Sequence, residues 1–414
     1  MNKIQATTYK RMAVAGVLLG IAAAVAVSCG PGLSAQGEVL VESNTQFALD
    51  FHRHLSANND GNANIFFSPF SISTAFAIAQ EGARGDTAAE IREVFGFPEE
   101  DISGDFRALR RIFDRGNGYQ LNTANGLWLQ EDHPFLEEYR DTAAEDYGAR
   151  LEEVNFKSNA SAVVKEINDW VSDATEGKIA RIVNNLSPEA RLAIANAIYF
   201  KGDWENPFEE PRTTNGEFNA PAGYVMVPLM RQHDEFRYAD IGFAQILQLP
   251  YEGDDLSMLI LLPKDVDGAA AELERELTSA NLAAWRGALD SREVRVELPR
   301  FKFETEYNLI DELRAMGLDA AFLPNGDDCS GSGANFEGID GTRCLHISQA
   351  QHQAVVEVNE EGTEAAAGTI LKIVPTSTPS YPLFRADRPF TFLIQHDESG
   401  AILFMGQVND PTAG

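Results

Sequence analysis

The sequence predicts an α+β fold made of one domain, and three observations support this prediction. Apolar residues at helical spacing are concentrated in the first half of the chain, whereas runs typical of buried strands crowd the second half. Helices and strands that are segregated in this way favour α+β over a repeated βαβ unit. From Glu38 onwards there is no long linker, internal repeat or charge block, so we expect one domain over residues 38–414.

Four segments have the apolar periodicity of helices that pack one face on a core. In the third of them, Val163, Ile167 and Val171 share a face, and Gly317 ends the fourth, as glycine commonly does. The predicted helices cover residues 43–55, 72–83, 160–174 and 307–316.

The predicted strands are short and several are apolar almost throughout, which is typical of central strands buried on both faces. Only residues 353–359 alternate clearly between apolar and polar side chains. The predicted strands cover residues 65–67, 192–200, 244–250, 257–262, 294–298, 353–359, 391–394 and 403–408.

The composition narrows the classes of partner. Apolar residues make up 44% of the chain, which is ample for a core, but 33 basic residues face 63 acidic ones and the formal net charge is −30. Nucleic acid is therefore not an expected partner, because phosphate binding needs clustered Lys and Arg. Docking of the folded body on anionic lipid through a basic face is not expected either.

The N-terminal segment resembles an export signal. A basic start is followed by an apolar run at residues 13–27, which is short for a membrane span and fits the central region of a signal peptide. The run ends in Ala26-Val27-Ser28-Cys29, which resembles the lipid-attachment box of bacterial lipoproteins. We therefore expect a signal peptide at 1–28, lipid on Cys29 and a flexible tether at 29–37, with secretion and cleavage nearby as the alternative.

Cys329 and Cys344 remain as a pair if Cys29 carries lipid. Both lie in a segment rich in Gly, Asp and Ser, which is typical of an exposed loop. Such a pair can oxidise outside the cytosol, so a disulfide is one hypothesis and two free thiols are the other.

Motifs for enzyme chemistry are weak. The seven histidines fit no zinc spacing, and there is no phosphate-binding glycine loop or nucleophile elbow. The spacing of Asp60, Asn62 and Asn64 begins like a calcium loop, but Ile65 stands where glycine is needed. We expect no metal, no cofactor and no catalytic residue.

The most informative segment follows the alternating strand at 353–359. As a strand it would place Thr363, Ala365 and Ala367 on one face, all of them small and uncharged, and Glu364 and Ala366 on the other. Such a segment can slide between two strands without burying a charge or a bulky group. The alternative interpretation is an ordinary loop or a helix cap, because alanine-rich runs favour helix. Gly362 would supply a permissive hinge. The whole segment reads Glu360-Glu361-Gly362-Thr363-Glu364-Ala365-Ala366-Ala367.

This segment resembles the proximal hinge of the serpins, a family of serine protease inhibitors. Three further segments, at residues 64–71, 196–204 and 384–390, resemble other serpin motifs in the right order, with Thr391 departing where an apolar residue is usual. The resemblance covers the chain from Glu38 onwards. It implies helices packed around three β-sheets and an exposed reactive-centre loop at about residues 360–382, in a member of bacterial lipoprotein type.

The resemblance also assigns roles to single residues. The polar cluster beneath the opening strands, called the shutter, would be Ser68, Ser71, Asn196 and His352. His352 taken alone could equally be an ordinary core or surface histidine. The point where the loop enters the sheet, called the breach, would comprise Trp204, Arg300 and Glu360, with an ion pair between Arg300 and Glu360 as a hypothesis.

Counting from the hinge with the serpin spacing places the bond cut by the target at Thr376–Ser377. Thr378 is the alternative, because the segment from Pro379 to Arg388 is about two residues longer than the serpin pattern. A small β-branched residue there disfavours trypsin-like and chymotrypsin-like proteases and favours elastase- or subtilisin-like ones. The resemblance implies a monomer that traps a serine protease, or alternatively a cysteine protease. A non-inhibitory serpin that carries a ligand or assists folding is the rival reading, and the small hinge residues argue against it.

Overall fold

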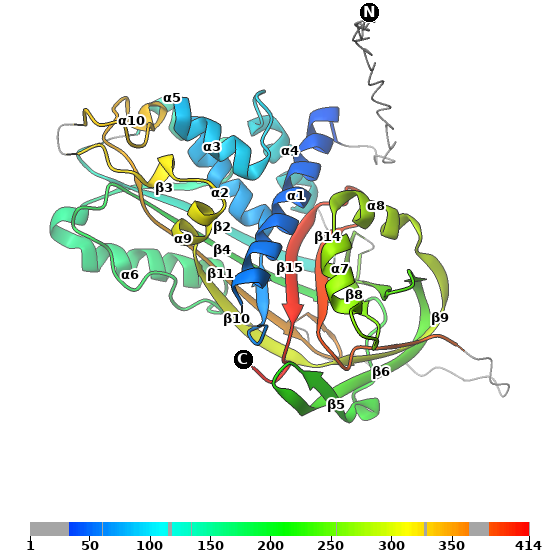
Figure 1. Ribbon diagram of the computed structural model, residues 1–414. Helices are drawn as coiled ribbons and strands as arrows, with labels where there is room; N and C mark the ends of the chain where they lie inside the picture. The colour runs from blue at the N-terminus through cyan, green and yellow to red at the C-terminus, as the bar shows by residue number, and fades with distance from the viewer. Residues whose placement is uncertain are drawn as a thin grey trace, which may run out of the picture.

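The computed structural model describes residues 33–413 except 60, 115–117, 134, 254, 327–328 and 364–380. It has the expected α+β architecture, in which helices surround two hydrogen-bonded sheets (Figure 1). The helices are α1 (Ala35–Asn58), α2 (Pro69–Gly82), α3 (Gly85–Phe95), α4 (Ser103–Phe113), α5 (Glu137–Glu145), α6 (Phe156–Ala174), α7 (Ala269–Glu276), α8 (Ser279–Gly287), α9 (Leu309–Ala315) and α10 (Glu337–Asp340), with 3-10 turns η1 (Glu210–Arg212) and η2 (Ala320–Phe322).

The six-stranded sheet has the order β10-β11-β12-β4-β2-β3, and its β12 contains two residues of the predicted insertion segment, Gly362 and Thr363. It mixes two parallel pairs, β4 with β11 and β2 with β3, with antiparallel neighbours. Its strands are β2 (Tyr119–Gln130), β3 (Arg150–Val154), β4 (Leu192–Asp203), β10 (Phe301–Asn308), β11 (Ile347–Val358) and β12 (Gly362–Thr363).

The nine-stranded sheet has the order β1-β15-β14-β8-β7-β6-β9-β13, with β5 paired to β6. The resemblance implies three sheets, and hydrogen bonds join two of them here because β6 pairs with β5, β7 and β9 along its length. The strands are β1 (Ile65–Phe67), β5 (Thr214–Ala220), β6 (Gly223–Asp240), β7 (Ala244–Pro250), β8 (Leu256–Pro263), β9 (Asp290–Pro299), β13 (Leu383–Arg385), β14 (Phe390–His396) and β15 (Ile402–Val408).

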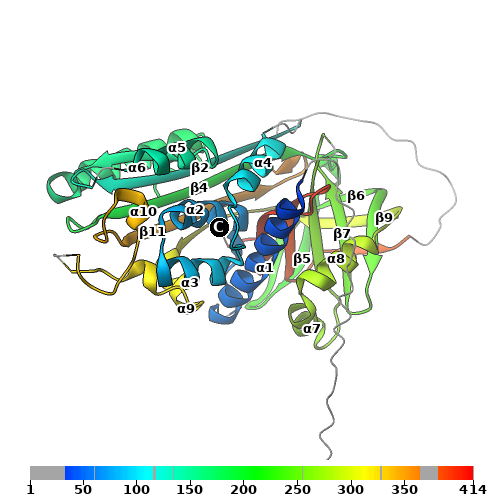
Figure 2. The ribbon, with the colours of Figure 1, turned by 90° about the horizontal axis from the view of Figure 1, so that it is seen from above.

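The two faces of the six-stranded sheet are covered by different helices, as Figure 2 shows from above. Helix α6 packs on one face through a cluster that includes Trp128 and Ile167. The other face, with Leu127 and Ile194, joins the main core beneath α2. Side chains alternate between the two faces of a strand, so successive residues of one strand point alternately towards α6 and towards α2.

Most predicted elements are confirmed, with shifted ends. The strand at 244–250 has the predicted bounds, whereas β11 begins six residues before the predicted start at 353. Residues 307 and 308 end β10 instead of starting α9. Helix α1 begins at Ala35 with Ser34 as its N-cap, so its first turn occupies part of the segment expected as a tether. Within the described ranges no helix is both long and apolar enough to cross a membrane.

Candidate functional site

The six-stranded sheet contains a seam between β4 and β11. The two strands pair in parallel from Leu192 with Ile347 to Ile198 with Ala354. Parallel neighbours need a crossover connection, so β4 and β11 are far apart in the sequence although they are adjacent in the sheet. This seam is the place at which another strand could be added to the sheet.

At one end of the seam two residues of the hinge, Gly362 and Thr363, already lie between the two strands. Gly362 pairs with Asp203, and Thr363 pairs with Gly202 of β4 and with Val358 of β11. Gly362 has no left-handed backbone conformation, in contrast to the expected permissive hinge. Glycine is needed there for another reason, since a Cβ atom on it would lie 2.1 Å from the carbonyl oxygen of Gly202.

Thr363 points into the protein, and its side chain has a specific partner. It is 2% exposed, and its hydroxyl lies 2.7 Å from the hydroxyl of Tyr251. Tyr251 stacks on Trp204 with ring centroids 4.6 Å apart, and the Trp204 indole N–H donates to the carbonyl of Asn359 at 3.1 Å. The two rings therefore hold the chain on both sides of the hinge. Sequence reasoning identified Trp204 but not Tyr251.

Replacing Tyr251 with Phe should loosen the hinge. The phenyl ring keeps the stack on Trp204, but the buried Thr363 hydroxyl loses its partner, which costs about 1–3 kcal/mol. We expect amide hydrogen exchange at Gly362 and Thr363 to become at least about fivefold faster, while exchange in β8 stays unchanged. Equal exchange at the hinge in both proteins would show that this hydroxyl pair does not hold it.

The predicted breach residues are brought together by the structure. The Arg300 guanidinium donates through Nε and Nη2 to the two carboxylate oxygens of Glu360, both at 2.5 Å, and the Thr213 hydroxyl also donates to that carboxylate. Burial alone would raise the pKa of Glu360, but the bonds from Arg300 and Thr213 outweigh it and hold this pKa below its usual value. The carboxylate therefore stays ionised and tied to the start of β10.

The four predicted shutter residues form one hydrogen-bonded cluster. Asn196 of β4 and His352 of β11 are direct neighbours across the seam, with His352 Nδ1 2.6 Å from Asn196 Oδ1. Asn196 Nδ2 donates to the Ser71 hydroxyl at 2.6 Å, and the Ser68 backbone N–H donates to His352 Nε2 at 3.1 Å. Asn196 also donates to Asn125 of β2, which sequence reasoning missed because no motif marks it.

Strand parity explains why this polar cluster exists. Asn196 shares a face with Ile194 and Ile198, and His352 shares a face with Ala350 and Ala354, so both point beneath the sheet towards α2. There the Ser68 side chain caps α2 by accepting from the N–H of Ser71. Opening the seam would break the bond from His352 to Asn196, and buried polar groups without partners cost about 1–3 kcal/mol each.

His352 is held neutral. Its Nε2 accepts a hydrogen bond, so Nδ1 carries the proton, and burial lowers its pKa from 6.5 to about 3. At a mildly acidic pH the native state therefore leaves His352 unprotonated, whereas an opened or unfolded state binds a proton there. Stability from this residue is fully present above pH 6.5 and falls by about 1.4 kcal/mol per unit as the pH drops from 6.5 towards 3.

Acid should therefore speed the loss of the native form. We expect the protein to lose its native monomer faster at pH 5 than at pH 7.5, as followed on native gels at a fixed temperature. His352→Gln should reduce this acid sensitivity but leave a remainder from His52, whose pKa burial lowers to about 4. Loss rates that are the same at both pH values would contradict this role of His352.

Several predicted residues lie outside the described ranges. They are the lipid-attachment residue Cys29, the hinge residues Glu364, Ala365, Ala366 and Ala367, and the reactive-bond residues Thr376, Ser377 and Thr378. Cys329 and Cys344 are described, and the structure joins them in a disulfide. In the part of the chain that is described, no group of three or more His, Cys, Asp or Glu side chains is placed to hold a metal ion.

Comparison with known proteins decides the family. The family model described as Serpin (serine protease inhibitor) matches residues 42–411. The chain is a serpin. An uncharacterized serpin-like protein of Thermococcus kodakarensis is 39% identical to it over 92% of this serpin and 87% of the relative. The human leukocyte elastase inhibitor is also 39% identical, over 90% of this serpin and all of the inhibitor.

A solved structure agrees with this assignment. Human thyroxine-binding globulin superposes with a TM-score of 0.81 and 29% identity, covering 91% of this serpin and all of that chain. Sheep antithrombin-III, a further sequence relative, is 36% identical over 90% of this serpin and 82% of the relative. Together the family and these relatives support protease inhibition as the general activity of this serpin.

Proposed function

We propose that this serpin is an irreversible suicide-substrate inhibitor of serine proteases of the elastase or subtilisin type. The observation that carries the proposal is the placement of Gly362 and Thr363 as β12 between β4 and β11. The first hinge residues already follow the path that the rest of the loop would take. The relative named leukocyte elastase inhibitor supports a target with a small pocket, as does Thr376.

The proposed cycle uses this chain as bait. The serine Oγ of the target attacks the Thr376 carbonyl carbon and forms an ester, and the amine of Ser377 leaves with a proton. The freed segment of about 15 residues can extend at roughly 3.3 Å per residue, which spans about 50 Å along the seam. The protease is carried with it and distorted before water can cleave the ester. No residue of this serpin performs catalysis in this cycle.

The cycle requires an active form that is not the most stable form. The loop gains strand hydrogen bonds only after it is cut, so the intact protein is metastable and its lifetime depends on kinetic barriers. Those barriers reside in contacts that must break when the seam opens. The bond from His352 to Asn196 and the ion pair from Arg300 to Glu360 are two such contacts.

We also propose that the protein works as a monomer outside the cytoplasm, attached to the outer membrane or cell surface by lipid on Cys29. Ala26-Val27-Ser28-Cys29 supports this location, as does the preceding apolar run at residues 13–27. A disulfide between Cys329 and Cys344 suits an oxidising compartment. Metabolic labelling with a radioactive fatty acid should mark the wild-type protein and not Cys29→Ser.

The proposal is tested by mixing the purified protein with pancreatic elastase, subtilisin, trypsin and papain. We expect a complex with elastase or subtilisin that survives boiling in detergent, and a released fragment that begins at Ser377 by mass spectrometry. A fragment that begins at Pro379 would move the cut to Thr378. Cleavage without any stable complex would contradict inhibition by trapping.

Ligand carriage is the second candidate, and the likeness to thyroxine-binding globulin is what favours it. That protein is named for binding thyroxine, so a serpin fold can serve a carrier. The same experiment separates the two functions, since a carrier has no need to trap a protease. Trapping of elastase or subtilisin would support the inhibitor, and simple cleavage would support the carrier.

A further inference from the structure

The disulfide closes a loop at the opposite end of the seam from β12. We call residues 329–344 the clamp loop, which runs from Cys329 to Cys344 and contains α10. Three residues after Cys344 the chain enters β11, at the first pair of the seam, Ile347 with Leu192. The clamp loop is therefore joined directly to one of the two strands that must separate.

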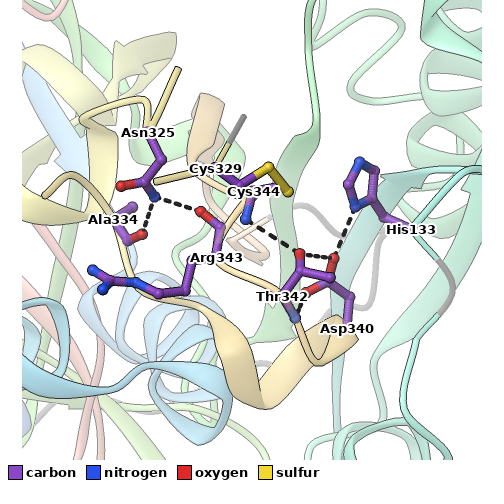
Figure 3. Close-up of a disulfide and its surroundings, with 8 residues drawn as sticks. All are labelled: His133, Asn325, Cys329, Ala334, Asp340, Thr342, Arg343 and Cys344. Atoms are coloured by element: carbon purple, nitrogen blue, oxygen red, sulfur yellow. Dashed lines mark hydrogen bonds and ion pairs between the residues drawn. A yellow bond between two sulfur atoms is a disulfide. The ribbon is translucent and has the colours of Figure 1, made fainter. Parts of the chain in front are cut away.

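A chain of hydrogen bonds connects the disulfide to the other side of the seam (Figure 3). The Cys344 backbone N–H donates to the Thr342 hydroxyl at 3.2 Å, and that hydroxyl donates to Asp340 at 2.7 Å. The same Asp340 oxygen lies 2.9 Å from Nδ1 of His133. The Asp340 carboxylate is fully buried, so this contact is shielded from water.

His133 lies in the turn after β2, on the opposite side of the seam from β11. It follows β2, which pairs along most of its length with β4. A second hydrogen bond joins the same two segments, because the backbone N–H of Leu136 donates to the carbonyl of Ile339 in the clamp loop at 2.8 Å. The clamp loop, covalently attached to β11, thus holds the segment attached to β2 and bridges the end of the seam.

Opening the seam for a new strand must strain this bridge. Inserting one strand moves β4 away from β11 by about 4.8 Å, one strand spacing. Hydrogen bonds of 2.8–2.9 Å cannot survive such a shift unless the clamp loop follows it. The disulfide prevents the loop from extending, and the Asn325 amide ties it further by donating to the carbonyls of Ala334 and Arg343, both at 2.5 Å.

We propose that the disulfide between Cys329 and Cys344 is a redox-sensitive clamp that sets the barrier to opening of the seam. The inference rests on the proposed insertion of the loop. Both cysteines are partly exposed, so a dithiol reductant can reach them. The reductant donates two electrons and two protons, the S–S bond becomes two thiols, and the reductant becomes a cyclic disulfide. The clamp loop can then extend as the seam opens.

Seam opening can be measured without a protease. A fluorescent peptide with the sequence of residues 363–376 would occupy the place of the loop in the sheet, so its rate of uptake reports opening. We expect uptake to be about fivefold faster after reduction with dithiothreitol, the change that the loss of one hydrogen bond of about 1 kcal/mol would cause. A count of free thiols confirms that the disulfide is open.

Two variants connect the effect to the clamp. A protein with Cys329→Ser and Cys344→Ser should take up peptide at the fast rate with or without dithiothreitol. His133→Ala keeps the disulfide but removes the bond across the seam, so it should also be fast, and reduction should add less than it adds to the wild type. Independent, fully additive effects would contradict a single clamp.

The outcomes separate this inference from the proposed function. Equal uptake by oxidised and reduced wild-type protein would overturn the clamp and leave strand insertion standing. Uptake by neither form would overturn both. Reduction that lowers the urea midpoint but leaves the uptake rate unchanged would show a disulfide that only stabilises the loop, and would also overturn the clamp.

Discussion

Ala365→Glu is expected to convert this serpin from an inhibitor into a substrate. The side chain of Thr363 is buried and points into the protein. Because side chains alternate along a strand, residue 365 would also point inward once the loop inserts. In the inserted form of the proposed cycle, an unpaired carboxylate on that face costs several kcal/mol. Because each 1.4 kcal/mol is a factor of ten, the yield of stable protease complex should fall more than tenfold, while cleavage at Thr376 continues.

Ala366→Glu is the matched control. It introduces the same charge one residue later, on the face where Glu364 already carries a carboxylate. Its yield of complex with elastase or subtilisin, measured on the same detergent gels, should stay within about twofold of the wild type. Similar losses in both variants would contradict an alternating, strand-like insertion, and no loss in either would contradict insertion altogether.

Arg300→Ala is expected to shorten the life of the active form about tenfold. The Glu360 carboxylate is 6% exposed and would lose both hydrogen bonds from Arg300 while keeping the one from Thr213. Removing one partner of a buried pair costs about 3–5 kcal/mol, and the partial exposure of Arg300 reduces this to about 1–3. The start of the hinge should then leave its place more readily. The loss of inhibitory monomer at 50 °C, followed on native gels, measures the effect.

Glu210→Ala provides the control for this prediction. Glu210 also faces Arg300, at 3.8 Å, but its side chain is 81% exposed and such surface pairs contribute little. Its variant should lose activity at the wild-type rate. If Arg300→Ala and Glu210→Ala behave alike, the ion pair with Glu360 does not guard the entrance to the seam.

The hinge could be predicted from the sequence because its requirement is local. The sequence itself shows small residues at every second position, and the side chain of Thr363 is buried, as this pattern predicts. The reason for Gly362 could not be predicted, since the carbonyl oxygen of Gly202 that excludes a Cβ atom comes from a strand 160 residues earlier.

The shutter was predicted from a resemblance and not from spacing. Ser68, Asn196 and His352 come from three separate elements, and only the pairing of β4 with β11 makes the last two neighbours. Asn125 and Tyr251 complete the site but carry no local signal. Their roles depend on which strand lies beside them. Contacts between strands that are distant in the sequence cannot be recognised from the residues next to either partner.

The central claim is that cutting the loop allows it to enter the sheet, and thermal unfolding before and after the cut tests it most directly. A trace of a protease that cuts but is not trapped would nick the loop, and calorimetry would compare the two forms. New strand hydrogen bonds on the order of 10 kcal/mol predict a rise in Tm of about 12 °C, because a domain of this size unfolds with an entropy of about 0.8 kcal/mol per kelvin. An unchanged or lower Tm in the cut protein would contradict insertion and the proposed mechanism with it.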